Sequence, residues 1–206
     1  MSTNKVLILC AYYRCGSTAL CEHYSKKYNL SNNDEMFFHD ADPDKVLKVL
    51  DSNSKYVLKI IASQWILNMK DKHRAYIKDV FTKDNTEVIL LYRKNISESI
   101  LSMAHCHHTN TWHNKQNKIS NSEVDKLVDK AVQTYSNEYT QSIGHINQII
   151  KFIKPNKVLE YTDVLNLPQS RFKKSITNEY YNQALSQINN KLDKQLTYES
   201  KYFTIT

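Results

Sequence analysis

Residues 6–18, VLILCAYYRCGST, decide the fold of this chain. Residues 6–11 are apolar without a break, which is typical of a strand buried on both faces of a parallel sheet. The run ends in the turn Arg14-Cys15-Gly16-Ser17-Thr18, and residues 19–28 have a helical pattern. Gly16 is one of only two glycines, and glycine permits the backbone shape and the close ligand approach that such a turn needs. A strand, a glycine turn and a helix direct backbone N–H groups at one point, so the stretch predicts a site for an anion such as phosphate.

The turn has two other interpretations. A P-loop that binds nucleoside triphosphates has Gly-Lys-Ser or Gly-Lys-Thr, whereas here Gly16 is followed directly by Ser17 and the cation, Arg14, precedes it. A plain strand-to-helix turn, with Ser17 as the N-cap of the helix, is the structural alternative.

The rest of the chain alternates apolar runs with helical patterns. Such alternation predicts an α/β fold in which a short parallel sheet is flanked by helices, a P-loop-like three-layer arrangement, and we expect residues 1–206 to form a single domain. The predicted strands are residues 6–11, 56–61, 87–92 and 157–161. The predicted helices are residues 19–28, 43–50, 71–81, 95–106, 122–153 and 178–192, and residues 107–121 are expected to form an irregular loop.

Composition narrows the class of partner. The chain has a formal net charge of +7, which favours anionic ligands, but its Lys and Arg residues are spread out, so we expect no nucleic-acid partner. No stretch approaches the length of a membrane span, and four cysteines without a Cys-x-x-Cys pair suggest a reducing compartment, so we expect a cytoplasmic protein without a disulfide framework. The sequence leaves the oligomeric state open, with a homodimer as one option.

A second group of polar residues follows the third predicted strand. Arg93 and Lys94 end that strand, and Ser102 lies two helical turns further on. Basic residues at the carboxyl end of a strand lie where open α/β sheets bind ligands, and a serine on the same helix adds a hydroxyl for a phosphate. The alternative is a solvated pair of cations.

These two groups give the chain a resemblance to sulfotransferases that use 3′-phosphoadenosine 5′-phosphosulfate (PAPS), and in particular to the bacterial trehalose-2-sulfotransferase-like group. The matches run in order along most of the chain, from the first strand to about residue 165. They are Tyr13-Arg14-Cys15-Gly16-Ser17-Thr18, Leu20-Cys21-Glu22, Glu35-Met36-Phe37, Lys59, Arg93-Lys94-Asn95 with Ser99 and Ser102, and Tyr161-Thr162-Asp163-Val164. The chain departs from the family pattern at Tyr13, Cys15 and Lys94, where proline, serine and arginine are usual.

The resemblance implies a role for each matched residue. It implies a sulfuryl transfer from PAPS to a hydroxyl acceptor, a carbohydrate or another small alcohol. The 5′-phosphosulfate would be bound by Arg14, Cys15, Gly16, Ser17 and Thr18. Lys59 would neutralise the bridging oxygen, and Arg93 or Lys94 with Ser102 would hold the 3′-phosphate.

The acceptor hydroxyl also needs a general base. The resemblance implies Glu35, whose apolar neighbours would favour a raised pKa, and His39 is the rival because histidine is the commonest base. The alternative is that Glu35 is a surface carboxylate in a polar stretch and has no catalytic role.

A metal site is not expected. Five potential ligands lie close together in the sequence, but their spacing fits no standard zinc pattern. These are His105, Cys106, His107, His108 and His113. A non-catalytic nucleotide-binding module and a small-molecule kinase remain as alternatives to the transferase.

Overall fold

The computed structural model of the chain describes residues 3–33, 36–37, 42–52, 55–110, 119–167 and 178–192. Its centre is a sheet of five strands in the order β2-β3-β1-β4-β5, and every pair of neighbours is parallel. The strands are β1 (Lys5–Cys10), β2 (Ser31–Asn33), β3 (Tyr56–Ile61), β4 (Thr86–Tyr92) and β5 (Lys157–Glu160). The predicted α/β fold with a parallel sheet is confirmed.

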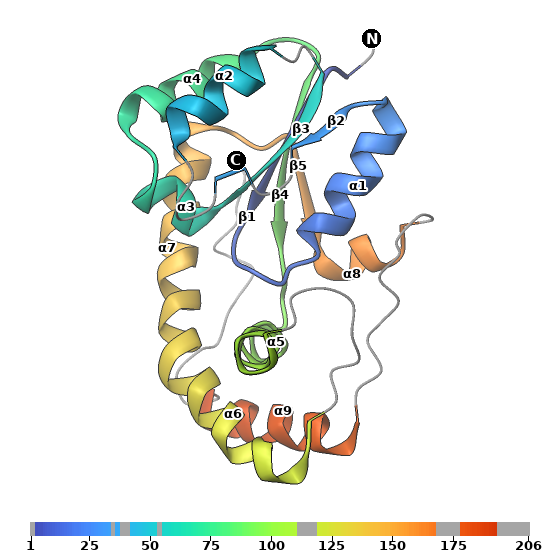
Figure 1. Cartoon of the computed structure of the whole chain (residues 1–206), viewed down its shortest axis with the longest axis vertical. Helices are drawn as coiled ribbons and strands as arrows, with labels where there is room; N and C mark the ends of the chain where they lie inside the picture. The colour runs from blue at the N-terminus through green and yellow to red at the C-terminus, as the bar shows by residue number, and fades with distance from the viewer. Residues whose placement is uncertain are drawn as a thin grey trace.

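Helices cover both faces of the sheet and its carboxyl edge (Figure 1). One face is covered by α2 (Pro43–Ser52), α3 (Ala62–Leu67), α4 (Asp71–Phe81) and α7 (Ser136–Phe152), and the other by α1 (Ser17–Tyr28) and α8 (Tyr161–Leu165). Beyond the carboxyl edge lie α5 (Ile96–Thr109), α6 (Val124–Lys130) and α9 (Glu179–Leu192). A 3₁₀ turn (Asn121–Glu123) precedes α6, and a π-helical segment (Ala131–Tyr135) joins α6 to α7.

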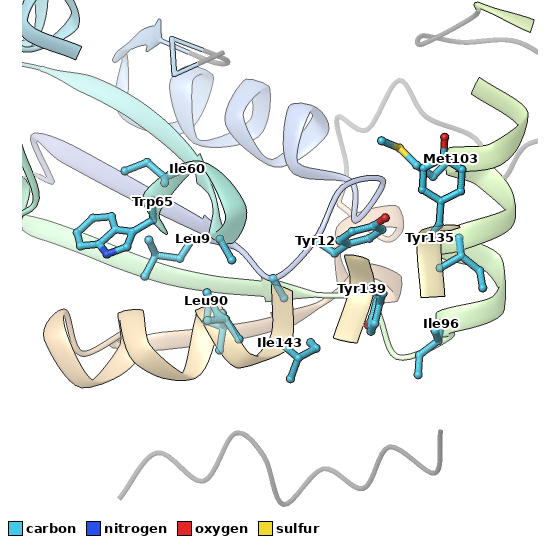
Figure 2. Close-up of a cluster of buried hydrophobic side chains, with 14 of the residues drawn as sticks. Leu9, Tyr12, Ile60, Trp65, Leu90, Ile96, Met103, Tyr135, Tyr139 and Ile143 are labelled. Atoms are coloured by element: carbon cyan, nitrogen blue, oxygen red, sulfur yellow. The ribbon is translucent and has the colours of Figure 1, made fainter. Parts of the chain in front are cut away.

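The alternation of side chains along the strands divides the core into two clusters. Leu7 and Leu9 of β1 face the larger cluster, where α7 packs through residues such as Tyr139 and Ile143 (Figure 2). Val6, Ile8 and Cys10 face the smaller cluster under α1 and α8. Both faces of β1 are therefore buried, which explains its unbroken apolar run.

Several elements differ from the sequence prediction. The edge strand β2 is missing from it because its three residues, Ser-Asn-Asn, are polar, and α3 and α8 are missing because each is a short helix directly after a strand. Tyr161 begins α8 instead of ending the last strand. The helix predicted over 122–153 is interrupted by the π segment, and residues 107–109 of the predicted loop belong to α5. None of the helices in the described ranges is long and apolar enough to cross a membrane.

Candidate anion-binding site

The turn between β1 and α1 lies at the carboxyl edge of the sheet, next to the end of β4. Its first residue, Ala11, continues the pairing with β4 by donating its N–H to the Leu91 carbonyl at 2.9 Å. The turn then bends through two residues in the left-handed region, Arg14 with a φ of 59° and Gly16 with a φ of 83°. Gly16 is the N-cap of α1 and Ser17 is the first residue of the helix, so the prediction that Ser17 is the N-cap is wrong. The first N–H groups of a 12-residue helix therefore face this edge of the sheet.

Gly16 packs against the ring of Tyr161, at the start of α8. A Cβ atom at residue 16 would lie 2.9 Å from Cδ2 and 3.0 Å from Cε2 of that ring, which is too close for any side chain. Glycine is required here both for its positive φ and for this contact. The element that the resemblance matched late in the chain, Tyr161 to Val164, thus lies directly against the turn.

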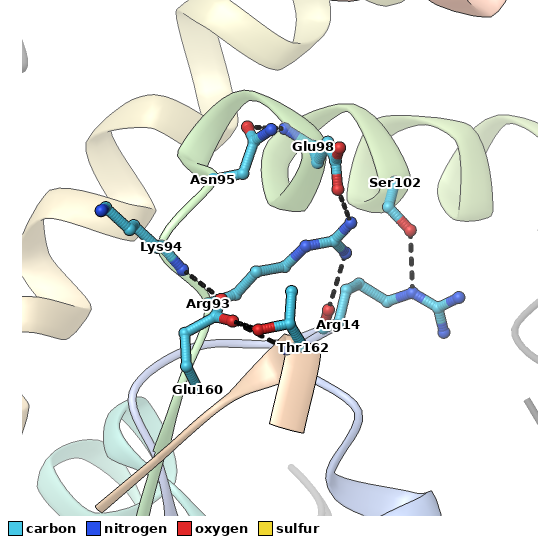
Figure 3. Close-up of polar contacts among 8 residues, drawn as sticks. All are labelled: Arg14, Arg93, Lys94, Asn95, Glu98, Ser102, Glu160 and Thr162. Atoms are coloured by element: carbon cyan, nitrogen blue, oxygen red, sulfur yellow. Dashed lines mark hydrogen bonds and ion pairs between the residues drawn. The ribbon is translucent and has the colours of Figure 1, made fainter. Parts of the chain in front are cut away.

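Arg93 directly follows β4, and its side chain contacts the backbone of the turn (Figure 3). Its Nη1 donates to the carbonyl oxygen of Arg14 at 3.1 Å, and its Nη2 forms an ion pair with Glu98. The guanidinium carbon lies 4.2 Å from the centroid of the Tyr161 ring, a cation–π contact. The Arg93 carbonyl in turn accepts a hydrogen bond of 2.9 Å from the hydroxyl of Tyr139 on α7.

Arg14 and Ser102 are brought together, although 88 residues separate them in the sequence. Arg14 Nε donates to Ser102 Oγ at 3.1 Å. Ser102 lies on the buried face of α5, whose N-terminus is capped by the Asn95 side chain, an acceptor for the Glu98 N–H at 3.0 Å. The turn and the second polar group of the sequence analysis are therefore one site.

Lys94 is not part of this arrangement. Its side chain is exposed and points away from Arg14 in Figure 3. Its backbone N–H donates to a carboxylate oxygen of Glu160 at 3.0 Å, and Glu160 also accepts from the N–H of Thr162 at 2.7 Å. Burial by itself would raise the pKa of Glu160, but the hydrogen bonds from Lys94, Thr162 and Tyr161 together hold it below its ordinary value. The local role of residue 94 is to link β4 to the cap of α8.

Lys59 is buried in the middle of β3, with an exposed fraction of 2%. It alternates with residues 58 and 60, which face the larger cluster, and therefore points to the α1 side of the sheet. Its charge acts there on the thiols of Cys10 and Cys15. A hydrogen bond from Cys10 lowers the pKa of Cys15, with Lys59 and the Ser17 N–H acting in the same direction, while burial raises the pKa of Cys10. The lysine thus lies close enough to act on the thiol of Cys15, the residue of the turn that precedes Gly16.

Of the remaining predicted site residues, the structure describes two and leaves the two candidate bases outside the described ranges. Ser17 and Thr18 are half-buried in the first turn of α1. Glu35 and His39, the two candidate bases, lie outside the described residues. Phe37, next to them in the sequence, is buried in the larger cluster.

The histidines that resemble metal ligands have other contacts. His105 and Cys106 are buried in α5, the ring of His107 stacks on Tyr135, and His108 pairs with Glu123 at 2.8 Å. His113 lies outside the described residues. Within the described parts of the chain, no group of three or more His, Cys, Asp or Glu side chains is placed to hold a metal ion.

Sequence reasoning missed the aromatic residues that line this edge. Tyr12 donates to Glu138 at 3.3 Å, and its ring lies 5.0 Å from that of Tyr139. Tyr181 reaches the same region from α9, and burial raises its pKa to about 12 against the opposing charges of Arg93 and Arg14. Only Tyr12 lies in the motif, and no local pattern marks its partners, because they come from helices more than a hundred residues away.

Comparison of the chain with protein-family models, with curated proteins and with solved structures finds no match in any of the three.

Proposed function

We propose that the protein is a PAPS-dependent sulfotransferase that transfers a sulfuryl group to a hydroxyl acceptor. The hydrogen bond between Arg14 and Ser102 carries this proposal, because it joins the two motifs from which the resemblance was drawn. One of these motifs is matched to the 5′-phosphosulfate and the other to the 3′-phosphate. A donor with anionic groups at both ends needs cations and hydroxyls on both sides of one site.

The position of the site also favours a nucleotide. In open α/β sheets, ligands bind outside the carboxyl ends of the strands, where the chain connections diverge. Here the connection after β1 leads to β2 on one side, and the connection after β4 leads to β5 on the other. The connections therefore diverge between β1 and β4, and the turn at residues 11–16 lies there, next to the end of β4.

The residues of the turn fit an anionic donor. The guanidinium of Arg14 and the N–H groups at the start of α1 bind the sulfuryl end, and the buried Lys59 stabilises the charge that develops on the leaving phosphate. In the reaction, a bond forms between the acceptor oxygen and sulfur while the bond from sulfur to the bridging oxygen breaks. The proton of the acceptor goes to Glu35, and the products are a sulfate ester and adenosine 3′,5′-bisphosphate.

Thermal unfolding in the presence of nucleotides tests the donor site. We expect adenosine 3′,5′-bisphosphate to raise the melting temperature more than AMP, ADP or ATP, because a ligand at about 100 times its Kd adds roughly 2.7 kcal/mol of stability. Arg14→Ala should abolish the shift. A larger shift with ATP would favour the kinase alternative, and no shift with any nucleotide would refute the proposal.

The base is tested separately, once labelled PAPS has identified an acceptor. Glu35→Gln should lower turnover by about 10²–10⁴-fold, the usual contribution of a general base, while donor binding is retained. His39→Gln is the matched control. Full turnover in Glu35→Gln together with loss in His39→Gln would transfer the role to the histidine.

A further inference from the structure

The guanidinium of Arg93 is engaged through both terminal nitrogens and one face, while its Nε is buried without a hydrogen-bond partner among the described residues. One Nη donates to the Arg14 carbonyl, the other pairs with Glu98, and the ring of Tyr161 lies against the plane at 4.2 Å. The side chain is only 11% exposed. A phosphate that Arg93 bound bidentately would share at least one of the two terminal nitrogens with these contacts, and it would compete with the carboxylate of Glu98 for the charge.

The contact with the Arg14 carbonyl bears on the shape of the turn. Arg14 has a φ of 59°, a conformation that an arginine adopts only where its surroundings enforce it. The carbonyl of this same residue is the one that Arg93 holds at 3.1 Å, while Tyr161, which contacts Arg93, also packs on Gly16. Arg93 thus fixes both left-handed residues of the turn, one directly and one through the tyrosine.

We infer that Arg93 is a positioning residue that holds the anion-binding turn in shape, and that Arg14 is the cation that acts with Ser102 on the second phosphate. This inference rests on the proposed function and changes its assignment of the phosphates. Arg14 Nε already donates to Ser102 Oγ, whereas the contacts of Arg93 all serve the turn and the two helices beside it.

Two ligands that differ only in the 3′-phosphate separate the two roles. In Arg93→Lys, which keeps the charge but cannot make the same pair of contacts, the affinity for AMP and the affinity for adenosine 3′,5′-bisphosphate should fall by the same factor, about tenfold. In Ser102→Ala, the preference for the bisphosphate over AMP should fall. If Arg93→Lys weakens only the bisphosphate, Arg93 binds the 3′-phosphate and the inference is wrong.

Arg74 offers a matched control whose hydrogen bonds go to α3 and α4 and not to the turn. It donates to the carbonyls of Trp65 and Ile66 at 3.1 and 3.0 Å, so Arg74→Lys also breaks an arginine–carbonyl clamp, but between α3 and α4. Arg74→Lys should leave the affinity for both nucleotides unchanged. A loss as large as that of Arg93→Lys would show that general destabilisation explains the result, and would overturn the inference.

Amide hydrogen exchange without ligand tests the clamp independently of any nucleotide. In Arg93→Lys, the amides of residues 11–18 should exchange at least several-fold faster than in the wild type, and in Arg74→Lys they should not. Unchanged exchange in Arg93→Lys would overturn the positioning role. If the wild type binds neither nucleotide, the proposed function fails, but the exchange result still decides whether Arg93 holds the turn.

Discussion

At the scale of single residues, the two glycines of the chain occupy opposite environments. Gly16 has a φ of 83° and lies under the Tyr161 ring, whereas Gly144 lies on the exposed side of α7 with nothing within 4 Å of an added Cβ. The first glycine is required by geometry, and the second only weakens a helix. The sequence alone indicated a role for Gly16 because it follows a buried strand, but not its contact with residue 161.

An alanine at each glycine should therefore have effects of opposite sign. We expect Gly16→Ala to lower the free energy of unfolding by about 2 kcal/mol or more, from the strained φ and the clash with the ring. Gly144→Ala should raise it by about 0.5–1 kcal/mol, since alanine is the better helix former. Urea titration of both variants measures this, and a stable Gly16→Ala would contradict the packing of α8 on the turn.

The side chain of Lys59 is only 2% exposed, and burial of a charged amine costs free energy of folding. We expect Lys59→Met to unfold at a temperature similar to or higher than that of the wild type, but to lose the shift that adenosine 3′,5′-bisphosphate produces. Lys26→Met, which removes an exposed charge from α1, is the control and should keep the shift. A retained shift in Lys59→Met would exclude the lysine from the anion site.

At the scale of secondary-structure elements, sequence patterns predicted those that the core requires. β1, β3 and β4 bury apolar side chains on both faces, with Lys59 as the exception inside β3. The stripe of α6 that holds Val124, Leu127 and Val128 is buried as expected. β2 escaped prediction because an edge strand of three polar residues depends on its pairing with β3, not on its own composition. The π segment likewise has no local signal, because its geometry depends on what packs around residues 131–135.

Glu123, just before α6, makes a contribution to stability that depends on pH. The pKa of Glu123 is lowered from an ordinary 4.5 to about 2. The main cause is a hydrogen bond from the Ser120 side chain, and the backbone N–H of Ser120 and the side chain of His108 act in the same direction. Because the folded-state value is depressed, the stability that this carboxylate adds is present above pH 4.5 and is lost as the pH falls towards 2. The melting temperature of Glu123→Gln should therefore be below that of the wild type at pH 6, and the two should converge by about pH 2–3. A constant difference across this range would contradict the assignment.

At the scale of the whole molecule, the net charge of the protein and the cations of the site act on ligand affinity over different distances, so salt can separate their effects. The net charge is +7, and the last turns of α1 and α7 carry Lys26 and Lys151. Changing both lysines to glutamate lowers the net charge by four, from +7 to +3. Lys26 is nine residues from the start of its helix, roughly 14 Å along the axis, which exceeds the Debye length of about 10 Å at 0.1 M salt.

The double variant Lys26→Glu, Lys151→Glu should consequently bind adenosine 3′,5′-bisphosphate more weakly than the wild type only at low ionic strength. We expect a several-fold loss of affinity at about 10 mM salt, where the Debye length is about 30 Å, and no difference at about 0.15 M. Arg14→Ala should instead lose affinity at both salt concentrations, because a contact within hydrogen-bond distance is little screened. Isothermal titration at the two concentrations distinguishes these cases. If the double variant binds as weakly as Arg14→Ala at 0.15 M salt, the ligand is held by the overall charge of the protein and not by the turn between β1 and α1.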